Sequence, residues 1–143
     1  MDKRVERLAT PEACERFIKN ALRLGHPDLA QQARRKAIEL RAEAHDARTA
    51  AERESLQAIY AYEELLTEKN GKHTRATRTW QMLKRHGIIE SVNRVVARQD
   101  DAVGYKTLKE KGLEDLSFEA VVLRYPDVFS PEAVEHARKR ITC

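Results

Sequence analysis

Apolar side chains recur every three or four residues along almost the whole chain, and this period restricts the fold more than any other feature. Phe17, Ile18, Ala21 and Leu22, for example, fall on one face of a helix. No stretch of five or more residues alternates apolar and polar side chains in a way that favours a strand over a helix. The 143-residue chain holds only five glycines and four prolines, so few positions interrupt helices. The sequence therefore predicts an all-α fold of about eight helices.

Capping residues and prolines mark where these helices begin. Thr10-Pro11 and Ser130-Pro131 each combine an N-cap hydroxyl with a proline suited to the first turn. Thr49, Thr74 and Ser117 are further N-cap candidates. The expected helices cover residues 11–24, 27–44, 50–69, 75–86, 88–98, 102–111, 118–124 and 131–142.

Residues 45–48 form the least defined boundary, because they contain neither glycine nor proline. The segments on either side could therefore form one rod over residues 27–70 or two helices folded into a hairpin. We favour the hairpin, because a rod would leave both apolar faces without an intramolecular partner. The first of the two helices carries a narrow, alanine-rich seam that would allow another helix to approach closely. The seam consists of Leu29, Ala33, Ala37, Leu40 and Ala44.

A chain of this length predicts a single helical domain over residues 1–143. The loop at 68–73 is the best candidate for an internal boundary. It would separate an N-terminal hairpin, residues 1–68, from a C-terminal cluster of short helices, residues 74–143.

The N-terminal segment lacks the apolar run of a secretion signal, and no stretch is apolar enough to span a membrane. We therefore expect a cytoplasmic protein without membrane contact. Cys14 and Cys143 are expected to remain reduced thiols, because nothing in the sequence requires them to pair.

Positive charge is concentrated in residues 69–98, which hold eight lysines and arginines and one acid, Glu90. Residues 1–68 hold 12 basic and 13 acidic side chains, and residues 99–143 hold seven basic and nine acidic ones. The whole excess behind the formal net charge of +4 therefore lies in one short segment. On a uniformly charged, solvated surface, the basic side chains would be spread along the whole sequence instead.

A helical wheel separates the basic side chains from the apolar ones in this segment. On the helix expected over 75–86, Ala76, Trp80 and Leu83 share one face, and Arg78, Gln81 and Arg85 lie opposite. On the next helix, over 88–98, the isoleucines and valines share one face. Its polar side chains Ser91, Arg94 and Arg98 lie on the other face. The two basic faces are joined by a short turn at Gly87.

Guanidinium groups bind phosphate well, because they offer planar pairs of donors and stay charged. We therefore expect a non-catalytic nucleic-acid-binding module with a helix-turn-helix-like pair over 69–98, which binds double-stranded DNA in preference to RNA. Arg94, Gln81 and Ser91, with Asn93, are expected nearest the bases. The side chains expected on or beside phosphates are Lys69, Lys72, Arg75, Arg78, Lys84, Arg85 and Arg98.

Three other interpretations fit the same residues. The basic face could simply be solvated and paired with acids such as Glu63-Glu64 or Asp100-Asp101. The chain could be a protein adaptor that uses the basic ridge against an acidic partner, or the alanine-rich seam for a partner or a second copy. A metal-dependent nuclease would need clustered carboxylates, for which Asp100-Asp101 is the place to look.

No motif for a catalytic nucleophile, a phosphate-binding loop, a zinc site or a dinucleotide is present, so we expect no catalytic residue, metal or cofactor. Trp80 could stack on a base, as aromatic side chains do in single-strand binders. Its helical face, shared with Ala76 and Leu83, favours a place in the core. Tyr60 and Tyr62 are also expected to pack internally.

Overall fold

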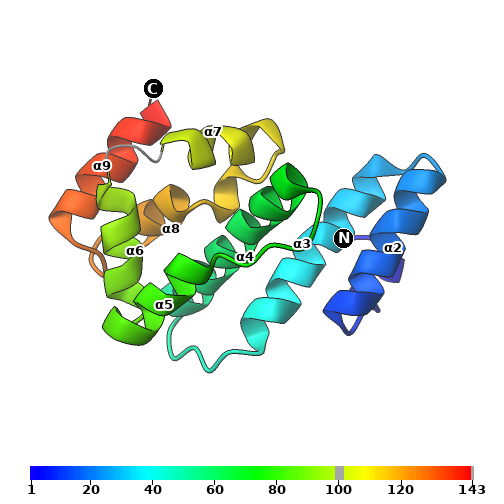
Figure 1. Cartoon of the computed structure of the whole chain (residues 1–143), viewed down its shortest axis with the longest axis horizontal. Coiled ribbons are helices and arrows are strands. Elements are labelled where there is room, and N and C mark those ends of the chain that lie inside the picture. Colours follow the sequence, from blue (N-terminus) through cyan, green and yellow to red (C-terminus); the bar gives the residue numbers. More distant parts are fainter. Residues whose placement is uncertain (99–101, 143) are drawn as a thin grey trace. The chain divides into compact units, whose positions relative to one another are not determined.

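The computed structural model describes residues 1–98 and 102–142. These residues form nine α-helices, one 3₁₀ helix and no strand, which confirms the predicted all-α class (Figure 1). The elements are α1 (Lys3–Glu6), α2 (Pro11–Arg23), α3 (Pro27–Glu43), α4 (Ala50–Asn70), α5 (Thr77–His86), α6 (Ile88–Ala97), α7 (Ala102–Glu110), η1 (Glu114–Leu116), α8 (Phe118–Arg124) and α9 (Pro131–Thr142).

Most helices begin where the capping chemistry predicted. Thr10, Thr49 and Ser117 each accept a hydrogen bond from a backbone N–H three residues later, at 3.0–3.1 Å. Ser130 does the same at the start of α9. Such bonds satisfy N–H groups that have no partner within the helix.

Thr74 is an exception, because α5 begins at Thr77 rather than at residue 75. The Thr74 hydroxyl donates to the carbonyl of Lys72, and its N–H donates to the Thr67 hydroxyl. The predicted cap is therefore wrong: Thr74 holds the loop against α4 instead of starting the next helix.

The rod over residues 27–70 is also excluded, because α3 ends at Glu43 and α4 begins at Ala50. The chain divides into two compact units, Met1–Asp46 and Ala47–Cys143. The division falls in the segment between α3 and α4, not in the loop at 68–73 that we proposed. The reason is that α4 packs against α6, α7 and α8 and therefore belongs with the C-terminal helices.

The N-terminal unit consists of α1, α2 and α3. Helix α3 packs along α2, where Ala21, Leu29 and Ala30 form a buried cluster with Phe17 and Ile18 beside it.

Three residues of the alanine-rich seam, Leu29, Ala33 and Ala37, are buried within the chain. Leu40 is half-buried and Ala44 is exposed, so docking of a partner or a second copy on this seam stays a prediction.

Cys14 is buried as a free thiol, and this burial raises its pKa. Cys143 and Asp100-Asp101 lie outside the described residues. The predictions that involve them therefore have no structural counterpart here.

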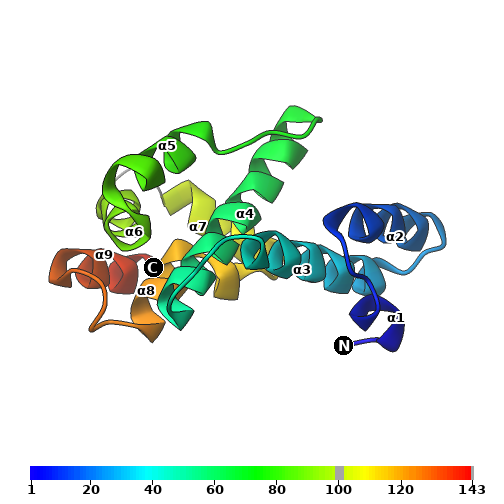
Figure 2. The same ribbon diagram turned by 90° about the horizontal axis from the view of Figure 1, so that it is seen from below.

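The C-terminal unit is built around α4 and α6. Helix α4 packs against α6, α7 and α8, and α6 also packs against α5 and α9. Figure 2 shows α5 and α6 together at one end of this unit, with the C-terminal end of α4 directed away from them. No helix among the described residues is long and apolar enough to cross a membrane.

Candidate nucleic-acid interface

A single residue, Gly87, joins the two basic helices. It ends α5 and starts α6, with φ 85° and ψ 170°. This backbone conformation is essentially restricted to glycine. The turn makes α6 rise steeply from the end of α5 (Figure 1).

The exposed faces of α5 and α6 meet in one hollow of about 460 Å³, which we call the arginine hollow. Two arginines from α5 lie opposite two arginines from α6 and its C-cap. No acidic side chain is among the described residues that line it. The lining residues are Arg78, Gln81, Met82, Arg85, His86, Arg94 and Arg98. The structure therefore brings together four of the arginines that the wheel placed on exposed faces.

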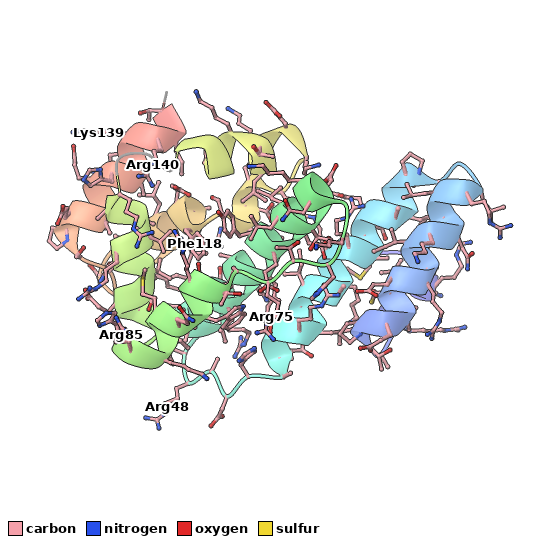
Figure 3. All side chains as sticks on the ribbon, in the orientation of Figure 1. Arg48, Arg75, Arg85, Phe118, Lys139 and Arg140 are labelled. Atoms are coloured by element: carbon pink, nitrogen blue, oxygen red, sulfur yellow. The ribbon has the colours of Figure 1, made fainter. Side chains whose placement is uncertain are left out.

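Few of these charges are neutralised by described neighbours. Arg94 pairs with Glu90 one helical turn earlier, with 3.2 Å between Nε and Oε1. Arg78, Arg85 and Arg98 are exposed and have no ion pair with a described residue. An exposed pair within one helix contributes little stability, so Arg94 can exchange Glu90 for another anion at small cost. Figure 3 shows Arg85 at the outer end of α5.

Ser91 is not part of this surface, although the wheel placed it there. It is fully buried, and its hydroxyl donates to the Gly87 carbonyl at 2.6 Å. Helix α6 packs against four other helices, so more of its circumference is covered than in a helix on the surface. A small side chain with a backbone acceptor one turn earlier can be buried at low cost. The prediction that Ser91 lies near a base is therefore wrong.

Asn93 has a structural partner as well. Its side-chain oxygen accepts the Ser130 N–H at 2.9 Å, which ties α6 to the start of α9. At the other end of α6, the Arg98 carbonyl accepts a hydrogen bond from the Arg140 guanidinium. Arg140 also pairs with Glu119 at 2.9 Å, and both of these side chains are nearly buried. These contacts hold α6, and with it Arg94 and Arg98, in place.

A second hollow of about 410 Å³ adjoins the first and shares Arg78 and Arg98 with it. We call it the aromatic hollow, because two rings, from α4 and α8, form part of its wall. Its lining residues are Tyr62, Leu66, Arg75, Ala76, Thr77, Arg78, Thr79, Val95, Arg98 and Phe118. Phe118 points inward from the start of α8 (Figure 3).

From the sequence, Glu63 is considered only as a partner for basic side chains, and its burial is not predicted. It is only 7% exposed, and its Oε2 accepts hydrogen bonds from the Ala76 N–H at 2.8 Å and from Trp80 Nε1 at 2.6 Å. A carboxylate of α4 thereby caps the start of α5, where no side chain of α5 does so. The available signal was its position, because Glu63 follows Ile59 by four residues and so falls on the apolar face of α4.

Trp80 packs against α4, in agreement with the core interpretation, but it is half-buried rather than fully enclosed. Its ring lies 5.2 Å from that of Tyr60, and the Arg75 guanidinium carbon lies 5.5 Å from its centroid. Arg75 also reaches Glu63 at 4.0 Å. One alternative from the sequence is that the basic segment pairs with acids such as Glu63. This pairing occurs at Arg75.

Lys69 and Lys72 lie away from the arginine hollow. The loop after α4 runs back along that helix, since Thr74 bonds to Thr67 and Ala76 bonds to Glu63. Lys69, in the last turn of α4, and Lys72, just beyond it, therefore lie at the far end of α4 (Figures 1 and 2). The expected gathering of these lysines with the arginines is not found. Lys84 is exposed on α5 but does not line the hollow.

The described residues contain no group of three or more His, Cys, Asp or Glu side chains arranged to hold a metal ion. Two acids near the basic segment have basic partners: Glu90 pairs with Arg94, and Glu68 pairs with Lys111.

Comparisons of this chain with protein-family models, with curated proteins and with solved structures found no match.

Proposed function

We propose that this chain is a non-catalytic nucleic-acid-binding module that holds the backbone of double-stranded DNA in the arginine hollow. The observation that carries the proposal is the convergence of Arg78, Arg85, Arg94 and Arg98 on one concave surface. Each helix alone contributes two arginines to this surface, whereas the pair places four arginines around one volume.

Phosphate oxygens are the ligands that this surface fits best. A guanidinium group offers paired donors that match phosphate geometry and cannot lose its charge at neutral pH. Several such groups in one hollow reinforce one another, because low-dielectric walls strengthen the local potential. Gln81 lies in the same hollow, and its amide can both donate to and accept from the edge of a base.

The test measures the binding of labelled duplex DNA, single-stranded DNA and RNA by fluorescence anisotropy. The double variant Arg78→Glu/Arg85→Glu places two negative charges in the hollow and should weaken duplex binding at least about tenfold at low salt. Both side chains are exposed and without a described ion pair, so the fold should persist. Circular dichroism checks that it does.

The matched control is Lys106→Glu/Lys109→Glu on α7, which changes the net charge of the chain by the same amount. Both lysines are exposed and line neither hollow. We expect this variant to retain most of the duplex affinity. Equal losses in the two double variants would mean that only net charge matters and would contradict a localised site. Absence of binding to all three nucleic acids at low salt would overturn the proposal.

A further inference from the structure

We infer that the aromatic hollow accepts the base of one unpaired nucleotide, while Arg78 and Arg98 hold the phosphate of that nucleotide. This inference rests on the proposed nucleic-acid function and adds a specificity that backbone binding alone would not have. It starts from the fact that the two hollows share these two arginines. A ligand that occupies both needs an anionic part beside a flat part that carries both apolar and polar surface, because Arg75, Thr77 and Thr79 line the aromatic hollow together with its rings.

The wall chemistry of the aromatic hollow suits a nucleobase. Tyr62 and Phe118 provide aromatic surface, and Leu66 and Val95 provide aliphatic surface. Thr77 and Thr79 add hydroxyl groups, which can donate to or accept from the polar edge of a base. A volume of about 410 Å³ lies within the range of about 300–1,000 Å³ that is usual for small-ligand sites.

Much of this wall belongs to the core and keeps its shape without a ligand. Ala76, Val95 and Phe118 are each at most 8% exposed. The buried carboxylate of Glu63 does not line the hollow, and its Oε2 is engaged by the Ala76 N–H and by Trp80. Its charge is therefore directed at the start of α5 and not at the space a base would fill.

A paired base cannot reach this hollow, because it is stacked within the duplex. The candidates are a strand end, an overhang or an extruded nucleotide, for which the cost of unstacking is smallest. A free mononucleotide has the same chemistry and is the second possible source. Stacking of one base on aromatic side chains increases affinity by a factor of about five or more.

The experiment compares a blunt duplex with the same duplex carrying a three-nucleotide overhang that ends in the fluorescent base 2-aminopurine. We expect the overhang to bind at least about fivefold more tightly. The 2-aminopurine emission should fall on binding, because the base stacks on Tyr62, the more exposed of the two rings. Deoxyadenosine 5′-monophosphate is tested separately, by quenching or shift of the single tryptophan, Trp80, which lies beside Arg75.

The variant Thr77→Phe fills the aromatic hollow without changing any charge, and Thr77→Ser is its matched control. Thr77 is exposed, so a larger side chain does not disturb the core. Thr77→Phe should bind the blunt duplex as the unmodified chain does but lose both the overhang preference and the 2-aminopurine quenching. Thr77→Ser should keep both.

Each outcome separates this inference from the proposed function. Tight blunt-duplex binding with no gain from the overhang would overturn the inference and leave the function standing. An overhang gain that survives Thr77→Phe would place the base elsewhere and also overturn it. Binding of the mononucleotide without binding of any strand would support the nucleotide site and overturn the proposed function. No binding of any of these ligands would overturn both.

Discussion

At the scale of single residues, two polar side chains show how much burial depends on an available partner. Ser91 is buried because the Gly87 carbonyl lies within reach of its hydroxyl. Glu63 is buried because two N–H groups from the next segment meet one of its oxygens. A buried carboxylate without such donors would be strongly unfavourable. Glu63 therefore ties the start of α5, and the arginines that follow, to α4.

Substitution Glu63→Ala should lower the free energy of unfolding by about 1–3 kcal/mol, because two donors lose their acceptor. Urea unfolding followed by Trp80 fluorescence measures this directly, since Trp80 is one of the two donors.

Glu63→Gln is the control for that substitution. Both donors meet the same oxygen, so an amide oxygen can accept both bonds, although more weakly than a charged oxygen. We expect Glu63→Gln to retain most of the stability. A loss as large as that of Glu63→Ala would show that the charge, rather than the hydrogen bonds, matters at this position.

At the scale of elements, the site depends on the turn between α5 and α6. Two helices separated by one residue can bring their exposed faces together only if that residue adopts an unusual backbone conformation. Gly87 does so, with φ 85° and ψ 170°. Gly71, at the end of α4, has φ 70° and ψ 9°, the ordinary left-handed conformation of a helix end. The two positions should therefore differ in how well they tolerate a residue other than glycine.

Gly87→Asn should lower the free energy of unfolding by about 1–3 kcal/mol, because this region of backbone space is restricted to glycine. Gly71→Asn should cost less than about 1 kcal/mol, because asparagine tolerates the left-handed conformation. No atom lies within 4 Å of an added Cβ at either position, so the difference reflects the backbone alone. Chemical denaturation of both variants provides the measurement. Equal costs would contradict the proposed role of the turn.

At the scale of the whole molecule, distance along the chain is a poor guide to which charges act together. Lys72 is six residues from Arg78, yet the intervening loop runs back along α4 and separates them. Arg94 and Arg98 are further away in sequence and line the same hollow as Arg78. The binding surface is therefore smaller than the basic segment.

The salt dependence of duplex binding tests this difference. Arg94→Gln/Arg98→Gln should lower the slope of log affinity against log salt by about 1.8, at about 0.9 for each lost phosphate contact. Lys69→Gln/Lys72→Gln removes the same charge from the far end of α4 and should leave the slope nearly unchanged. Anisotropy titrations at several salt concentrations on a short duplex supply both slopes. A reduced slope for the lysine variant would extend the interface along α4.

Local chemistry made much of this fold predictable from sequence. The period of apolar residues, the N-cap hydroxyls of Thr10 and Ser117, and the glycine at 87 all act over a few residues. The same local period placed Arg78 and Arg85 together on the exposed face of α5.

Other features depend on contacts between distant segments, and sequence patterns do not reveal these. Thr74 does not cap a helix, because it bonds to a neighbour on α4. Ser91 is buried, because other helices of the fold cover its side of α6.

By itself, the sequence determined the all-helical class, most helix starts and the basic character of two adjacent helices, because hydrogen bonding and side-chain period operate within one or two turns. Only the tertiary structure decided that the arginines of α5 and α6 share one hollow, that an aromatic hollow adjoins it, and that Lys69 and Lys72 lie elsewhere. The physical reason is packing. Which faces meet depends on how α4, α6 and α8 bury their apolar surfaces together, and that outcome belongs to the assembled C-terminal unit rather than to any one segment.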